Sequence, residues 1–184
     1  VLMITHKVLA TQQGYEQLLE ILADGLSDKE DPFLIFFMET VEPIYKALKN
    51  SNMQLLFDTL GIKRFPIKKK SEKAKWKELQ QQLENARTKR AIDVFELIKQ
   101  SKLIPIPPKL DGWYHLYQEA PETVYASNAS IQSFLELEYL QFAAVIDFLH
   151  PDAMFSTEHS VKGEEYDNVV FVIGRGWNLY HFET

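Results

Sequence analysis

The sequence predicts an α/β fold at both ends of the chain, interrupted by a mostly helical insertion. Residues 168–173 form an apolar, β-branched run ended by Gly174, which is typical of a strand buried on both faces. Residues 1–5 indicate a second short buried strand, followed by a polar turn and a helix to about Leu22. Because strand, turn and helix open the chain, and helix, strand, loop and buried strand close it, we expect α/β structure at both ends.

Composition limits the class of protein. The chain has 184 residues, 46% hydrophobic and 12% aromatic, which is enough to bury a real core. It has no cysteine, which excludes disulfides and thiolate metal sites and favours a cytoplasmic location. No apolar run predicts a membrane span or a leader. The first residue is Val1, inside a strand-like run, so we expect a piece of a longer protein.

Residues 24–102 show helical spacing almost throughout. Asp31 and Pro32 predict a capped helix start, and Pro43 predicts a break or kink. Ser51 is expected to cap the next helix and Gly61 to end it. Later apolar stripes are expected to face the core: Trp76, Leu79, Leu83 and Ala86, then Ile92, Phe95 and Ile98.

Prolines and a glycine predict an irregular linker over residues 103–122, before a helix at 130–149. The linker contains Trp113, Tyr114 and Tyr117. Exposed aromatic rings can stack on bases or on a partner. The alternative is that they pack against neighbouring helices.

A basic segment stands out on an acidic chain. Residues 63–90 contain eleven basic and three acidic side chains, whereas the whole chain carries a net charge of −6. Lys68, Lys69 and Lys70 form its densest part. Such a segment can attract the phosphate backbone of DNA without reading sequence. The alternative is a solvated helix face.

A polar loop directly precedes the C-terminal apolar run. Its order is Thr157-x-His159-x-x-Lys162-Gly163-x-Glu165-Tyr166. This order resembles motif V of the UvrD/Rep-like superfamily 1 helicases, with Glu164 where that family usually has leucine. Thr5, in the turn after the first strand, matches the threonine of that family's motif IVa. Without the resemblance, the loop reads as a surface connection.

The resemblance implies a fold and a domain organisation. Residues 1–24 and 128–184 would form part of a RecA-like domain of the P-loop NTPase type, called 2A, with a parallel sheet. Residues 25–127 would be the helical insertion called 2B, with its proline-rich return linker. The missing N-terminal RecA-like domain of the same protein would then be the partner of this fragment.

The resemblance also implies an activity. The parent would be an ATP-dependent DNA helicase that moves 3′ to 5′ on single-stranded DNA toward a duplex junction, in DNA repair or in phage defence. It would use ATP and Mg²⁺. Because the sequence contains no Gly-x-x-x-x-Gly-Lys-Ser/Thr loop, we expect the fragment alone to be inactive. We also expect no metal site, because the loop has no second histidine at ligand spacing.

The family assigns roles to the loop residues. Gly163, Glu165 and Lys162 would face ATP, because glycine permits close approach to phosphate and a carboxylate accepts hydrogen bonds from ribose. Thr157, His159 and Thr5 would face single-stranded DNA. A surface ion pair between Lys162 and Glu165 is the plainer interpretation. The rival function is a non-catalytic nucleic-acid or protein interaction module.

Overall fold

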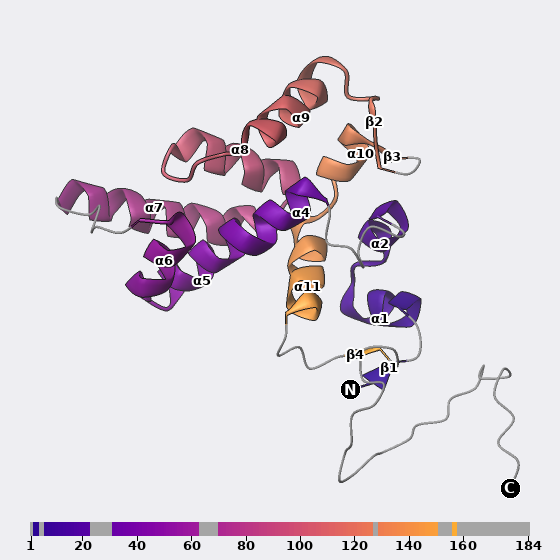
Figure 1. Cartoon of the computed structure of the whole chain (residues 1–184), viewed down its shortest axis with the longest axis horizontal. Helices are drawn as coiled ribbons and strands as arrows, with labels where there is room; N and C mark the ends of the chain where they lie inside the picture. Colours follow the sequence, from indigo (N-terminus) through magenta and orange to yellow (C-terminus); the bar gives the residue numbers. More distant parts are fainter. Residues whose placement is uncertain are drawn as a thin grey trace, which may run out of the picture.

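The computed structural model describes residues 2–3, 6–22, 31–62, 70–126, 129–150 and 156–157 (Figure 1). Helices make up most of this part of the chain. They are α1 (His6–Gln13), α2 (Glu16–Leu22), α4 (Pro32–Phe36), α5 (Glu42–Lys49), α6 (Met53–Leu60), α7 (Lys70–Ala86), α8 (Ala91–Ser101), α9 (Pro108–Glu119), α10 (Ile131–Leu135) and α11 (Tyr139–Leu149), with the π-helical segment η1 (Phe37–Val41). The strands are β1 (Leu2–Met3), β2 (Val124–Ala126), β3 (Ala129–Ser130) and β4 (Ser156–Thr157).

The predicted α/β class, with a RecA-like parallel sheet, is wrong for the described residues. They contain two small sheets: β2 and β3 pair antiparallel, and β1 and β4 pair in parallel over two residue pairs. A parallel sheet with helices on both faces needs several buried strands. Here helices bury most of the apolar surface against other helices instead. The run 168–173, predicted as a central strand, lies outside the described residues.

The segment from α4 to α5 is one helical stretch that continues past Pro43. The Asp31 carboxylate accepts a hydrogen bond from the backbone N–H of Leu34 at 2.7 Å, and Pro32 occupies the first turn, so the predicted start is confirmed. Of the predicted break or kink at Pro43, the break is wrong, because helical structure runs on from η1 into α5. In η1 the backbone bonds shift by one residue, so that Glu42 N–H donates to the carbonyl of Phe37. This π turn accommodates a proline that would clash with a regular α-helical turn.

The helices α6, α7 and α8 follow the predicted stripes. Asn52, one residue after the predicted Ser51, caps α6 by accepting from Leu55 N–H at 3.1 Å. Gly61 ends α6 with φ +65°, as predicted. The expected core residues of the two following helices are all buried: Trp76, Leu79, Leu83 and Ala86 on α7, and Ile92, Phe95 and Ile98 on α8.

The predicted linker over residues 103–122 is wrong, because α9 begins at Pro108. Proline is well tolerated in the first turn of a helix, where its missing N–H would have had no intrahelical partner. The aromatic residues of this segment pack inward. Trp113 contacts the ring of Tyr125 at 4.8 Å, and Tyr114 contacts Phe95 at 5.5 Å between centroids. Packing against neighbours is therefore the correct alternative for these two rings.

The predicted helix 130–149 is two helices, α10 and α11, separated by residues 136–138. The break has a long-range cause. The backbone N–H of Ala91 donates to Leu137 O, and that of Tyr139 donates to Lys89 O, both at 2.8 Å. This connection is therefore bound to the turn between α7 and α8, where it cannot continue as a helix.

The hydrophobic core is centred on an aromatic cluster. Phe33, Phe37, Phe95, Phe134 and Phe142 have no exposed surface. Phe37 and Phe134 each meet Phe142 edge to face at 5.3 Å. The same continuous core extends from Ala10 on α1 to Ile146 on α11. The described residues on both sides of the predicted boundaries at 24 and 128 therefore share one core, and the division into domains stays a prediction.

Candidate functional site

The parallel pair β1–β4 contains one of the residues predicted to form the site. Leu2 pairs with Ser156, and Met3 with Thr157, so Thr157 lies in β4. The other predicted loop and turn residues, Thr5, His159, Lys162, Gly163 and Glu165, lie outside the described residues, as do Lys68 and Lys69. Lys70 is the first residue of α7. Lys70 and Thr157 belong to separate elements (Figure 1).

Two helices lie close to this strand pair in sequence. The helix α1 begins three residues after β1, and α11 ends seven residues before β4. The Gln141 side chain connects α11 to α2, because its Oε1 accepts from Leu18 N–H at 3.1 Å and its Nε2 donates to Gln17 Oε1 at 2.9 Å. Figure 1 shows β1 and β4 beside α1, beyond the C-terminal end of α11. The pair thus contacts the core through α1, which packs against α2, and α2 in turn packs against α11.

Tyr15 is the one buried side chain of the described residues whose polar atom has no hydrogen-bond partner. It lies between α1 and α2, is 1% exposed, and stacks on Phe148 of α11 with ring centroids 6.2 Å apart. Burial raises the pKa of its hydroxyl to about 12. The hydroxyl therefore stays protonated and neutral near pH 7, and it does not act as a base.

A buried polar network joins α5, α11 and the turn after α7. The Glu42 carboxylate, 2% exposed, accepts from Tyr139 Oη at 2.9 Å and pairs with Arg87 at 3.2 Å. The Arg87 guanidinium lies over the Tyr45 ring, 4.1 Å from its centroid. Burial raises the pKa of Glu42, while Arg87 and Tyr139 act in the opposite direction. Every polar group here has a partner, so the network holds helices together and presents no free group to a ligand.

The predictions from sequence did not include this network. Glu42 is 45 positions from Arg87 and 97 from Tyr139. The only local signal is an acidic residue among the apolar neighbours Val41 and Ile44. Such a pattern predicts a buried carboxylate but does not identify its partners.

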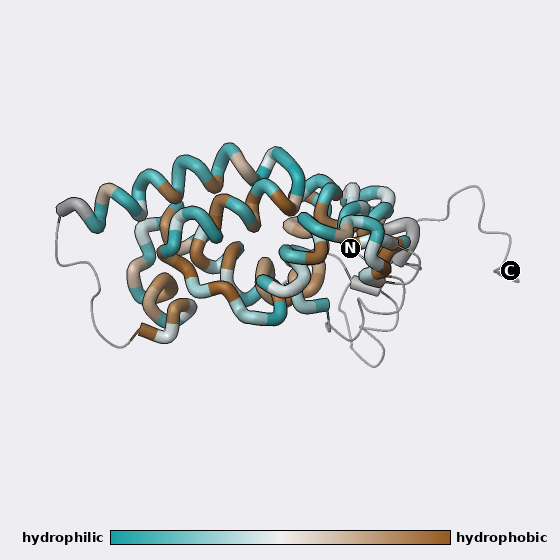
Figure 2. The backbone as a smooth tube through the Cα atoms, turned by 90° about the horizontal axis from the view of Figure 1, so that it is seen from above, coloured by the Kyte–Doolittle hydropathy of each residue, from teal (hydrophilic) through white to brown (hydrophobic). Residues whose placement is uncertain are grey.

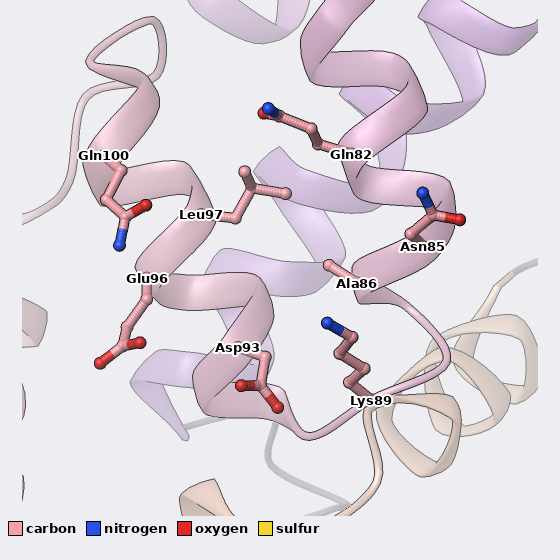
Figure 3. Close-up of a pocket in the computed structure, with 8 residues that line it drawn as sticks. All are labelled: Gln82, Asn85, Ala86, Lys89, Asp93, Glu96, Leu97 and Gln100. Atoms are coloured by element: carbon pink, nitrogen blue, oxygen red, sulfur yellow. The ribbon is translucent and has the colours of Figure 1, made fainter.

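A shallow hollow of about 330 Å³ lies between α7 and α8 (Figure 3). Gln82 and Asn85 of α7 and Leu97 of α8 are among its lining residues. Lys89 is the one cation among the lining residues, and Asp93 and Glu96 lie on the α8 side. The two carboxylates already accept hydrogen bonds, Asp93 from Arg90 and Glu96 from Tyr114. The mixed charge makes the hollow a poor site for a polyanion.

The described residues contain no group of three or more His, Asp or Glu side chains that could hold a metal ion. None of the helices in the described ranges has the length and apolar character needed to cross a membrane. No family model, curated protein or protein of known structure matches the chain.

Proposed function

We propose that the chain is part of an ATP-dependent DNA helicase of superfamily 1, in which the loop 157–165 contributes contacts to ATP and to single-stranded DNA. One observation carries the proposal: β1 and β4 pair in parallel, with Met3 opposite Thr157. The motif IVa match at Thr5 follows β1, and the motif V match begins within β4 at Thr157, 152 positions further along. Pairing of these two short segments is what a shared site requires.

The parallel direction of the two strands matters. Parallel strands end at the same edge, so the chain continues from neighbouring points after Met3 and after Thr157. Thr5 and His159 are each two positions further along. Two residues of extended chain span at most about 7 Å, which leaves both within reach of one nucleic-acid backbone. A shared site needs these two strands to end at one edge, but it does not need further strands in the sheet.

The roles of the loop residues follow from their chemistry and from the helicase resemblance. The Glu165 carboxylate accepts hydrogen bonds from a ribose hydroxyl, Gly163 lets the backbone approach phosphate, and Lys162 provides a cation for phosphate charge. Thr157 and His159 donate to the DNA backbone. The phosphate-binding loop and the Mg²⁺ ligands would come from an N-terminal nucleotide-binding domain of the parent protein.

The nucleotide role is tested by Glu165→Ala in the full-length parent protein. Loss of a hydrogen bond to a charged group costs about 1.5–3 kcal/mol, so we expect KM for ATP to rise roughly 10- to 100-fold. Affinity for single-stranded DNA should stay unchanged. The neighbouring Glu164→Ala is the matched control and should alter neither quantity. Unchanged ATPase kinetics in Glu165→Ala would refute the nucleotide role.

The DNA role is tested by Thr157→Val, which keeps the β-branched shape suited to β4 and removes only the hydroxyl. We expect affinity for single-stranded DNA to fall by roughly five-fold, the value of one ordinary hydrogen bond, with ATP binding unchanged. An unchanged DNA affinity would exclude this hydroxyl from the contact.

The second candidate is a non-catalytic nucleic-acid or protein interaction module. It is favoured by the predominance of helices in the described part of the chain. It predicts that neither Glu165→Ala nor Glu164→Ala changes ATP binding or ATP hydrolysis. The comparison of these two variants therefore separates the candidates.

A further inference from the structure

The exposed lysines of α7 lie on two different sides of the helix. The buried stripe of α7, which includes Trp76, Leu79 and Leu83, faces the core. The helix has α5 on one side and α8 on the other (Figure 1). Because residues three, four and seven apart share a helix face, the register of α7 assigns each lysine to one side.

Lys73 and Lys77 belong to the side that faces α5. They are four residues apart, and Glu84 lies seven residues beyond Lys77 on the same stripe. Glu84 is the residue that α5 contacts: Tyr45 Oη donates to it, and Lys49 Nζ is 3.7 Å from its Oε1. Lys49 therefore extends the stripe onto α5. We call Lys49, Lys73 and Lys77 the lysine row.

The cations of the row are available to a ligand. Lys73 and Lys77 are exposed and have no ion pair within the described part of the chain. Lys49 also donates to Tyr45 Oη at 3.0 Å, but the Lys49–Glu84 pair is more than half exposed on both sides, so it contributes little and opens readily. At about 1.5 Å per residue, the stripe from Lys73 to Glu84 extends about 16 Å, which is the axial rise of about five phosphates of one DNA strand.

The opposite side of α7 differs in charge. Lys75 lies seven residues before Gln82 and so faces the hollow between α7 and α8. There Asp93 and Glu96 lie beside Lys89, so the charge on this side is mixed. The cationic surface is thus restricted to one side of the helix, although lysines occur on both.

We propose that the lysine row binds the sugar–phosphate backbone of duplex DNA without reading its sequence. The row has charge and spacing suited to phosphates. A protein partner fits less well, because interface cores need apolar anchors. The exposed large hydrophobic residues in the described ranges are Leu116, Val124 and Leu140, none of them on α5 or α7. Along α7 the outer surface is mostly hydrophilic (Figure 2). This inference rests on the proposed function only for the choice of DNA.

The test compares two double variants that remove the same charge from the two sides of α7. Binding of a short fluorescein-labelled duplex is measured by anisotropy over a range of NaCl concentrations, without ATP. For Lys73→Gln/Lys77→Gln we expect the slope of log affinity against log salt to fall by about 2, and affinity near 0.1 M salt to fall roughly 10- to 50-fold. Lys75→Gln/Lys89→Gln should change affinity less than about two-fold, because neither lysine contacts phosphate.

Three results would overturn the proposal. Equal weakening by both double variants would indicate a general effect of net charge. No weakening by either would exclude DNA from α7. Tighter binding of a polyglutamate peptide than of the duplex would indicate an acidic protein partner. Circular dichroism checks that both variants stay folded, which exposed Lys→Gln changes permit. Since ATP is absent, the outcome is independent of Glu165→Ala.

Discussion

Two buried tyrosines differ in a way that a single substitution can measure. Tyr15 and Tyr139 are 1% and 0% exposed, but only Tyr139 has a hydrogen-bond partner, the Glu42 carboxylate. A buried polar group without a partner loses its hydration and gains nothing in exchange. The same Tyr→Phe change should therefore have opposite effects at the two positions.

We expect Tyr15→Phe to leave the free energy of unfolding unchanged or to raise it by up to about 1 kcal/mol, because only an unsatisfied hydroxyl is lost. Tyr139→Phe should lower it by about 1–3 kcal/mol, because a buried carboxylate loses a donor. Urea unfolding of the two variants beside the wild type provides the measurement. Loss of stability in Tyr15→Phe would show that its hydroxyl has a partner after all.

Glu42 predicts a pH dependence. Burial raises its pKa in the folded state above the ordinary value of 4.5. Above pH 4.5 the unfolded chain therefore loses this proton while the folded protein still holds it, so stability falls as pH rises through this window. Glu42→Gln removes the titration and keeps an acceptor for Tyr139. We expect the stability of the wild type minus that of Glu42→Gln to decrease as pH rises from 4.5. Parallel curves in urea unfolding at several pH values would contradict this.

At the scale of elements, the apolar stripes of α7 and α8 were predictable because residues at helical spacing must share a face. The effect of each proline was not. Pro43 was expected to break or kink a helix, and Pro108 to belong to a linker, but the helix continues past Pro43 and Pro108 starts α9. The outcome depends on whether an N–H at that position would have had a hydrogen-bond acceptor within the helix. That depends on the backbone hydrogen bonds of the neighbouring turns. Local sequence does not specify those bonds.

The candidate surfaces were predictable only in part. The basic segment was evident from sequence, but the separation of Lys73 and Lys77 from Lys75 requires knowing that α5 contacts Glu84. Lys49, outside the basic segment, could not have been added without that contact. The split between α10 and α11 has the same origin, since it depends on the pairing of Tyr139 N–H with Lys89 O. Contacts distant in sequence decide these features.

Glycine offers a test at this scale. Gly61 ends α6 with φ +65°, whereas Gly112 lies inside α9 with no positive φ, and neither would meet another atom if a Cβ were added. Gly61→Ala should cost about 1–2 kcal/mol through left-handed backbone strain. Gly112→Ala should raise the free energy of unfolding by about 0.5–1 kcal/mol, because alanine restricts the unfolded chain and favours a helix. Thermal unfolding of both variants measures the difference, and equal shifts in Tm would contradict the assigned backbone conformations.

At the scale of the whole molecule, the described part has one hydrophobic core. Leu18 of α2 belongs to the same buried cluster as Phe95 of α8 and Phe142 of α11. The backbone of Leu18 is also bonded to the Gln141 side chain. The first helices thus lie against α11, which follows residue 128. A chain with a single core of this size is expected to unfold in one step, whereas two domains can unfold separately.

Unfolding in one step can be tested with a substitution in the N-terminal segment. Leu18 has no exposed surface, and Leu→Ala at such a site costs about 2–5 kcal/mol. Tryptophan fluorescence reports on Trp76 of α7 and Trp113 of α9 once Trp177 is replaced by phenylalanine. In one cooperative unit, Leu18→Ala must shift the fluorescence transition in urea by the same free energy as the transition seen by circular dichroism. If residues 1–24 and 25–127 formed independent domains, fluorescence would be unaffected and the two transitions would separate.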